Sequence, residues 1–115
     1  MNLETFLAQL RAAPAGIAFA DTMALIDAHY DFTPAQFTNG ALVNAAGLNA
    51  GSCKLLAFAL LNKLSEQETL ACFGAYYRDD VLGHPDGDDH QNIRNFMQTG
   101  WAGVKFESMP LQAKN

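Results

Sequence analysis

The segment from Ser52 to Leu64 limits most strongly what this chain can fold into, because nearly all of its side chains are apolar. It contains the unbroken run Leu55-Leu56-Ala57-Phe58-Ala59-Leu60-Leu61. A helix that is apolar around its whole circumference has no face to offer to water, so other elements must enclose it. The run is shorter than the roughly 18 residues that indicate a membrane span. We therefore expect the central helix of a globular core.

The length and composition indicate one domain that covers residues 1–115. Half of the 115 residues are hydrophobic, and 17% are charged, which is below the roughly 25% of an average soluble domain. A chain of this size can bury a core without help from disulfides or metal ions.

The charge pattern excludes some classes of partner. Twelve acidic residues oppose seven basic ones, giving a net charge of −5, and the basic residues are scattered, whereas a nucleic-acid surface needs them clustered. No apolar run is long enough for a membrane span, and the N-terminus lacks the basic start of a signal peptide. We expect a cytoplasmic protein that binds a protein or a small molecule, with no nucleic acid and no membrane; the oligomeric state stays open.

Two amphipathic helices and an extended segment are expected before the core helix. Apolar residues recur at helical spacing from Leu3 to Leu10 and again from Phe19 to a helix end near His29. Between Tyr30 and Gly40, alternation, a proline and an Asn39-Gly40 pair indicate an extended segment with a turn.

After the core helix, Ser65 and Glu68 form a capping-box pattern that predicts a helix from Glu66 to Gly83. Its expected buried stripe comprises Leu70, Phe73, Tyr77 and Val81. Gly74 lies in the middle of this helix and costs about 1 kcal/mol relative to alanine, so it suggests close helix packing or a break.

The last part of the chain should add one helix and one strand. Asp88 and Gln91 resemble a second capping box, followed by Ile93, Phe96 and Met97 on one face and by Gly100 as a stop. The stretch from Trp101 to Glu107 alternates like a strand that could pair with residues 30–37, and the tail from Ser108 should fray. The expected fold class is mainly α (α+β): a compact helical domain with a small two- or three-stranded sheet.

The stretch from Tyr76 to Asn95 holds five of the eight aspartates and two of the three histidines. Imidazoles and carboxylates are metal-ligand types, so His84, Asp86 and His90 could hold a divalent ion, but their spacing matches no strong metal signature. Residues 85–87 suit a turn, Asp88 suits a helix cap, and His90 suits a half-buried position. We favour the turn and cap, and expect no metal and no cofactor.

Arg78 has two interpretations. It could pair with a carboxylate and fix the turn after Leu82, which we favour, or it could face outward as a recognition group. The same stretch is the candidate binding surface, with these residues: Tyr77, Arg78, Asp79, Asp80, His84, Asp86, Asp89, His90, Asn92, Arg94 and Asn95.

Cys53 is the candidate reactive thiol. It precedes Lys54 at the start of the core helix, where a helix dipole and a lysine favour the thiolate, and any of the three histidines could be its base. It also opens an apolar helix, where a cysteine usually packs. We favour packing for Cys53 and a reduced state for both Cys53 and Cys72; no catalytic residue is assigned.

Several blocks together resemble the HopJ type III effector family, over roughly residues 3 to 107. They are His29–Pro34, Phe37–Gly40, Gly51–Leu55, Cys72–Leu82, Asp89–Phe96 and Thr99–Trp101. The resemblance implies a family named for a type III secretion substrate of a plant pathogen, without an established activity, catalytic residue or cofactor.

Three function hypotheses follow. Because the helical pattern begins at Leu3, we expect no room for the flexible polar leader of a secreted effector, and place a small cytoplasmic binding protein first. A type III effector that acts on a host protein comes second. A small enzyme that uses Cys53, or a metal held by His84, Asp86 and His90, comes third.

Overall fold

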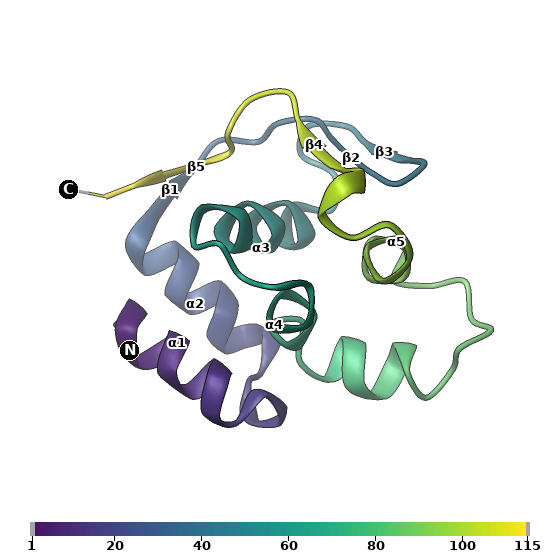
Figure 1. Ribbon diagram of the computed structural model, residues 1–115. Coiled ribbons are helices and arrows are strands. Elements are labelled where there is room, and N and C mark those ends of the chain that lie inside the picture. The colour runs from purple at the N-terminus through teal and green to yellow at the C-terminus, as the bar shows by residue number, and fades with distance from the viewer. Residues whose placement is uncertain (1, 115) are drawn as a thin grey trace.

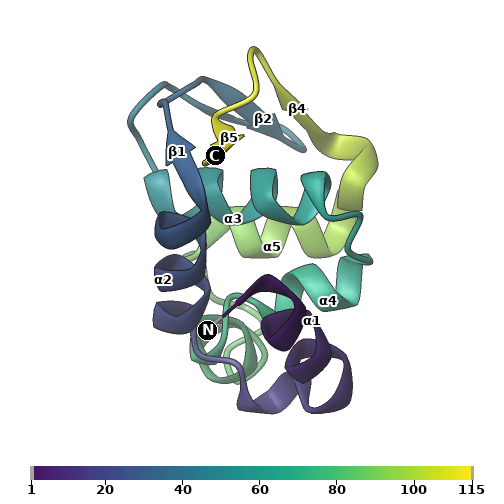
Figure 2. The same ribbon diagram turned by 90° about the vertical axis from the view of Figure 1, so that its left-hand side faces the viewer.

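The core helix lies at the centre of the molecule, as its composition requires. The computed structural model describes residues 2–114, and in it α3 (Ala50–Leu61) is surrounded by the other elements (Figure 1). Its residues 55–59 are all fully buried, but the enclosure expected for the whole apolar run stops there, since Leu60 and Leu61 are each 43% exposed. The strands lie over one side of α3, while the other side faces α1 (Leu3–Ala12), α2 (Phe19–His29) and α4 (Glu66–Ala71) (Figure 2). The fold is α+β with a helical majority, which confirms the expected class.

The predicted helices α1, α2 and α4 begin where their sequences indicate. Asn2 caps α1 by accepting a bond from the Thr5 amide at 2.7 Å. The capping box of α4 is present, since the Glu68 amide donates to Ser65 Oγ at 3.1 Å and the Ser65 amide donates to Glu68 Oε1 at 2.8 Å. A single 3₁₀ turn, η1 (Pro14–Gly16), joins α1 to α2.

Gly74 interrupts the long helix that was predicted from Glu66 to Gly83. Its φ of +64° favours glycine, and a Cβ there would lie 2.7 Å from the Phe19 amide nitrogen. Both alternatives therefore hold: the chain breaks at this residue, and α2 packs closely against it. After the break, Tyr76–Val81 forms a short π-helical segment, η2.

A three-stranded antiparallel sheet joins the extended segment to the end of the chain. Its strands are β2 (Phe37–Asn39), β3 (Leu42–Asn44) and β4 (Val104–Phe106), in the order β3-β2-β4. The expected pairing of residues 101–107 with residues 30–37 holds only at the end of the second segment, where Phe37 pairs with Phe106; β4 otherwise pairs with Thr38 and Asn39. The predicted strand is shorter than expected, because Gly100–Gly103 forms a 3₁₀ turn, η3, before β4.

A second, two-stranded sheet corrects the prediction that the tail frays. β1 (Tyr30–Phe32) pairs with β5 (Leu111–Ala113), and the Lys114 amide donates to the His29 carbonyl at 2.9 Å. Leu111 is buried in the core, and this apolar contact holds a segment that has little strand pattern of its own.

The start and the exposed face of α5 (Gln91–Thr99) also differ from the prediction. The residue before the helix is His90 in a left-handed conformation, so Asp88 is not the cap. Ile93 and Phe96 are buried, but Met97 is 44% exposed. Gly100 ends the helix with φ +58°, as predicted. Within residues 2–114, no helix is both long and apolar enough to cross a membrane.

Candidate functional site

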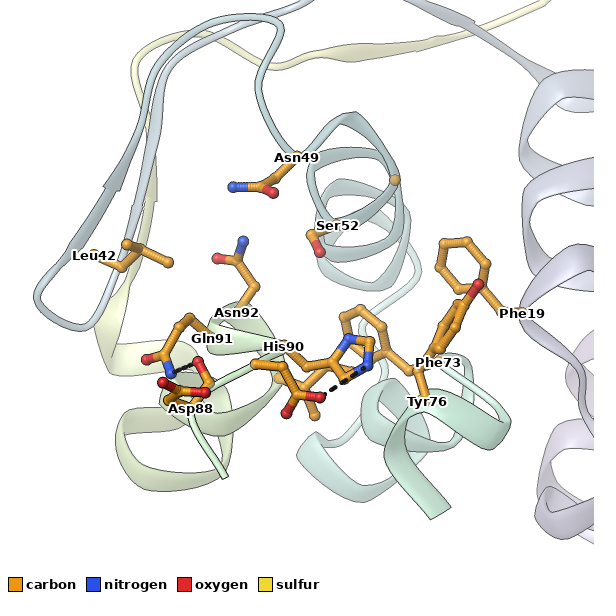
Figure 3. Close-up of a pocket in the computed structure, with 13 residues that line it drawn as sticks. Phe19, Leu42, Asn49, Ser52, Phe73, Tyr76, Asp88, His90, Gln91 and Asn92 are labelled. Carbon is orange, nitrogen blue, oxygen red and sulfur yellow. Dashed lines mark hydrogen bonds and ion pairs between the residues drawn. The ribbon is translucent and has the colours of Figure 1, made fainter. Parts of the chain in front are cut away.

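A cavity of about 600 Å³ opens between the first turns of α3 and α5 (Figure 3). Its walls come from segments that are far apart in the chain: Phe19 at the start of α2, Leu42 in the β2-β3 hairpin, residues 49, 51 and 52 at the start of α3, and residues 73 and 76 before and within η2. Residues 88–93 complete it. Convergence of separate segments on one concave space is typical of a ligand site.

His90 is the central ionisable group of this cavity. Its Nε2 lies 3.1 Å from Asp80 Oδ2 and 3.9 Å from Asp89 Oδ2. Its ring packs on Tyr76 with centroids 5.2 Å apart and a 36° tilt. The carboxylates and the aromatic ring fix the imidazole, and because Nε2 is engaged, Nδ1 is the nitrogen that can meet a ligand.

Aromatic rings form one wall of the cavity. Phe19 meets Tyr76 edge-on at 5.2 Å and stacks on Phe73 at 6.3 Å. His90 packs beside these rings, and Ser52 faces the same space from α3 (Figure 3). The cavity thus offers an apolar, planar wall and hydrogen-bonding groups together.

The first turns of α3 and α5 contribute backbone polarity. Asn49 and His90 precede these helices in left-handed conformations, and neither side chain caps the helix it precedes. The amides of a first helical turn lack intrahelical acceptors and carry partial positive charge. Asp88 and Asp89 lie beside them and oppose an anion. Partially positive amides beside negative carboxylates favour a polar ligand without a strong net charge.

Four asparagines form a polar network next to the cavity. The side-chain amides of Asn44 and Asn92 bond reciprocally at 3.2 and 3.0 Å, and Asn49 Nδ2 donates to Asn44 Oδ1 at 2.7 Å. Asn39 Nδ2 donates to the Asn92 carbonyl at 2.7 Å. The network connects the β2-β3 hairpin to the starts of α3 and α5, so it fixes the relative positions of the cavity walls.

Arg94, and not Arg78, holds the loop that precedes the cavity. Its Nη1 donates to the His84 carbonyl at 2.9 Å, its Nε to the Asp89 carbonyl at 2.6 Å and its Nη2 to Asp89 Oδ1 at 2.7 Å. This pairing lowers the pKa of the Asp89 carboxyl. The prediction for Arg78 was wrong: its Nη2 donates to the Ile17 carbonyl at 2.9 Å, because the segment after the Gly74 break carries Arg78 to η1.

The structure divides the predicted binding surface. Asp89, His90 and Asn92 line the cavity, and Asp80 reaches it through His90. The other members lie elsewhere: Arg94 and Asn95 line a hollow beside Pro85, Tyr77 and Arg78 line a hollow against α1, and Asp79, His84 and Asp86 are exposed.

Sequence reasoning missed most of the remaining lining. Phe19, Asn49, Ser52, Phe73 and Tyr76 belong to the cavity but were not among the predicted binding residues. For Asn49 and Ser52, the sequence signal was the Asn49-Ala50-Gly51-Ser52 stretch, in which an asparagine that favours turns precedes the start of the core helix.

Cys53 lies in the core and is 2% exposed. Its Sγ lies 3.9 Å from the Ala35 carbonyl oxygen, and burial raises the pKa of its thiol. Burial also raises the pKa of Cys72, to about 12. A raised pKa opposes the thiolate that a nucleophile requires, so the geometry gives the cysteine-enzyme hypothesis no support.

His84, Asp86 and His90 do not gather into a metal site. Across residues 2–114, no three side chains of histidine, cysteine, aspartate or glutamate come together as metal ligands would. His84 Nδ1 instead lies 3.2 Å from the Asp80 carbonyl oxygen. The expected absence of metal and cofactor stays a prediction.

Comparisons with known proteins place the chain next to uncharacterised relatives. The model of the family described as HopJ type III effector protein matches residues 3–111. Among solved structures, the chain is similar to one titled "Crystal structure of unknown function protein VPA0580", with a TM-score of 0.98 and 58% identity. That match covers 99% of this chain and 95% of the other. The search of curated proteins found no match.

Proposed function

The chain belongs to the HopJ type III effector protein family, and from this premise we propose that it is a small cytoplasmic binding protein that holds a small polar molecule in the cavity between α3 and α5. Neither the family description nor the similar structure supplies an activity. The proposal therefore depends on the geometry of this site.

One observation carries the proposal: a histidine fixed by a carboxylate faces a cavity that is lined by five separate segments of the chain. A volume of about 600 Å³ lies within the usual range for small-molecule sites, roughly 300 to 1,000 Å³. The asparagine network supports the same walls from behind, so the site is formed before a ligand arrives.

The lining indicates the chemistry of the ligand. A planar ring could lie against Tyr76 and Phe19, while polar substituents bond to the Ser52 hydroxyl, to His90 Nδ1 and to the amides of the first helical turns. Because those amides and the carboxylates of Asp88 and Asp89 have opposite charge, the ligand should be close to neutral. Small heteroaromatic molecules with an amide or hydroxyl group fit this description.

The test is a binding screen read by amide chemical shifts. We expect neutral heteroaromatic amides and alcohols to shift the resonances of Gly51, Ser52 and residues 90–93 in a saturable way. Ser52→Phe should abolish these shifts by filling the cavity, while Ser108→Phe, an exposed position outside it, should leave them unchanged. A panel of such compounds that shifts none of these amides, or that binds Ser52→Phe equally well, would overturn the proposal.

The family description raises a second candidate, a type III secreted effector that acts on a host protein. The supporting observation is the match over residues 3–111. The test is to express the full chain in its bacterial host, with and without a functional type III apparatus, and to measure it in the medium. Export that depends on the apparatus supports this candidate, and equal retention in both strains contradicts it.

A further inference from the structure

A second cavity, of about 410 Å³, lies where the end of α1 and η1 meet α4 and η2. Leu10 and Ala71, both buried, contribute apolar surface to it, and Pro14, Ala15 and the Tyr77 side chain complete its apolar part. It shares no lining residue with the cavity between α3 and α5. It therefore needs an explanation of its own.

The charge of this cavity is opposite to that of the molecule. Two guanidinium groups, those of Arg11 and Arg78, and one carboxylate, that of Glu68, belong to its lining. One positive charge is thus left over, in a chain whose net charge is −5. The first cavity has the reverse character, since Asp88 and Asp89 lie on its rim.

Arg78 carries the charge that is not neutralised. Glu68 is already engaged, because its Oε2 accepts from Arg11 Nε at 3.1 Å and its Oε1 accepts from the Ser65 amide at 2.8 Å. Arg78 donates to two carbonyl oxygens, that of Ile17 at 2.9 Å and that of Pro14 at 3.4 Å. No ion pair formed by residues 2–114 includes Arg78.

The two carbonyls orient the guanidinium without cancelling its charge. A guanidinium has five N–H donors, and these two bonds leave others for a further acceptor. Arginine binds carboxylates in preference to neutral acceptors, since such bonds are charge-assisted. An oriented arginine beside an apolar surface matches a molecule with an anionic head and an apolar body.

We propose that this second cavity binds a small alkyl carboxylic acid, with its carboxylate on Arg78 and its alkyl chain against Pro14, Ala15 and the Tyr77 side chain. The proposal is independent of the function assigned to the first cavity, because the two sites share no lining residue and the first favours a ligand close to neutral, not an anion. A protein with both sites would hold two chemically different ligands.

The experiment is a titration of the full chain with octanoate at neutral pH, below its aggregation concentration, read by amide and arginine side-chain chemical shifts. We expect saturable shifts at Ala71, Tyr77 and Arg78, and none at Ser52 or His90. Octanol and octylammonium, which have the same chain without the negative charge, should bind at least about tenfold more weakly, the scale for one charge-assisted bond.

Two variants separate the charge from the shape of the site. Arg78→Gln removes the positive charge, keeps a polar side chain at this position and should weaken octanoate binding about tenfold. Ala15→Phe fills the cavity from an exposed position, leaves Arg78 intact and should abolish binding. Lys105→Gln removes an exposed cation elsewhere and should change nothing.

Three results would overturn the proposal. They are equal binding of octylammonium and octanoate, octanoate shifts centred on the first cavity, and unchanged octanoate binding by Ala15→Phe. Failure of the heteroaromatic screen at the first cavity would not alter any of these readouts, so the two proposals fail separately.

Discussion

At the scale of single residues, Arg94 explains why the loop from His84 to Asp89 is ordered despite its carboxylates. Its side chain is 11% exposed and bonds to the carbonyls of His84 and Asp89 as well as to the Asp89 carboxylate. Arg94→Ala should therefore destabilise the protein by about 1 to 3 kcal/mol, the scale for losing charge-assisted bonds. Urea unfolding measures this loss.

Arg78→Ala is the matched control for that prediction. It also removes hydrogen bonds to carbonyls, but those belong to η1, so hydrogen exchange should increase near Ile17 and stay unchanged from His84 to Asp89. Arg94→Ala should show the reverse pattern. Opening of the His84–Asp89 loop in Arg78→Ala would contradict the assignment of these two arginines.

The two arginines also show which structural features a sequence can predict from single residues and which it cannot. Proline, aspartate and glycine at 85–87 predict a turn from local chemistry alone, and the structure has a turn there. Which arginine side chain bonds to that turn depends on the direction of the chain after Gly74, and contact with α2 sets this direction. Local spacing carries no information about that contact, so the wrong arginine was chosen.

Both cysteines should react slowly with iodoacetamide in the native state at neutral pH. Each is buried, the pKa of each thiol is raised by burial, and the thiolate is the reacting species. Mass spectrometry after timed alkylation, with and without urea, measures the two rates. Rapid native alkylation of Cys53 that a single histidine variant abolishes would restore the nucleophile hypothesis.

At the scale of elements, two similar capping patterns had different outcomes. Ser65 and Glu68 form the predicted box, and the Arg11 contact leaves it intact, because Arg11 donates to Glu68 Oε2 while the Ser65 amide donates to Oε1. Asp88 and Gln91 do not, because His90 is held by Asp80, and Asp89 is held by Arg94. These contacts shift the start of α5 past Asp88. A cap pattern therefore marks a helix start only approximately where contacts of the neighbouring residues, here Asp89 and His90, fix the backbone.

The capping box of α4 leads to a prediction about pH. The bond from the Ser65 backbone is the first cause, and Arg11 a further one, of a lowered pKa of Glu68 in the folded protein. Stabilisation by the ionised form is then complete above the ordinary pKa of glutamate and is lost as pH falls through the lower, folded value. Glu68→Gln keeps an acceptor for the Ser65 amide but removes this charge.

We therefore expect Glu68→Gln to lower the free energy of unfolding at pH 7 and to converge with the wild type at the acid end. Urea unfolding across the acid range measures this. Glu4→Gln, in the first turn of α1, is the control for the helix dipole alone and should have a smaller effect at pH 7. A loss for Glu68→Gln that is equal at all pH values would show that packing, and not charge, is responsible.

At the scale of the whole molecule, the helices were predictable and the pairing of the strands mostly was not. An apolar helix such as α3 dictates its own burial, so its central position follows from its sequence. The strands are three residues each, too short for alternation to reveal them. The candidate cavity was partly predicted, since Asp89, His90 and Asn92 were on the expected binding surface, while its aromatic wall comes from segments that only the fold brings together.

The strand β5 permits the strongest test of the assembled fold. Leu111 is 2% exposed and belongs to the core, whereas Met109, two residues earlier, is 39% exposed. Leu111→Ala should destabilise the protein by about 2 to 4 kcal/mol, since it leaves a cavity in the core. Met109→Ala should change stability by about 0.5 kcal/mol or less. Urea unfolding compares the two, and equal, small losses would mean that the tail frays and that β1 has no partner in solution.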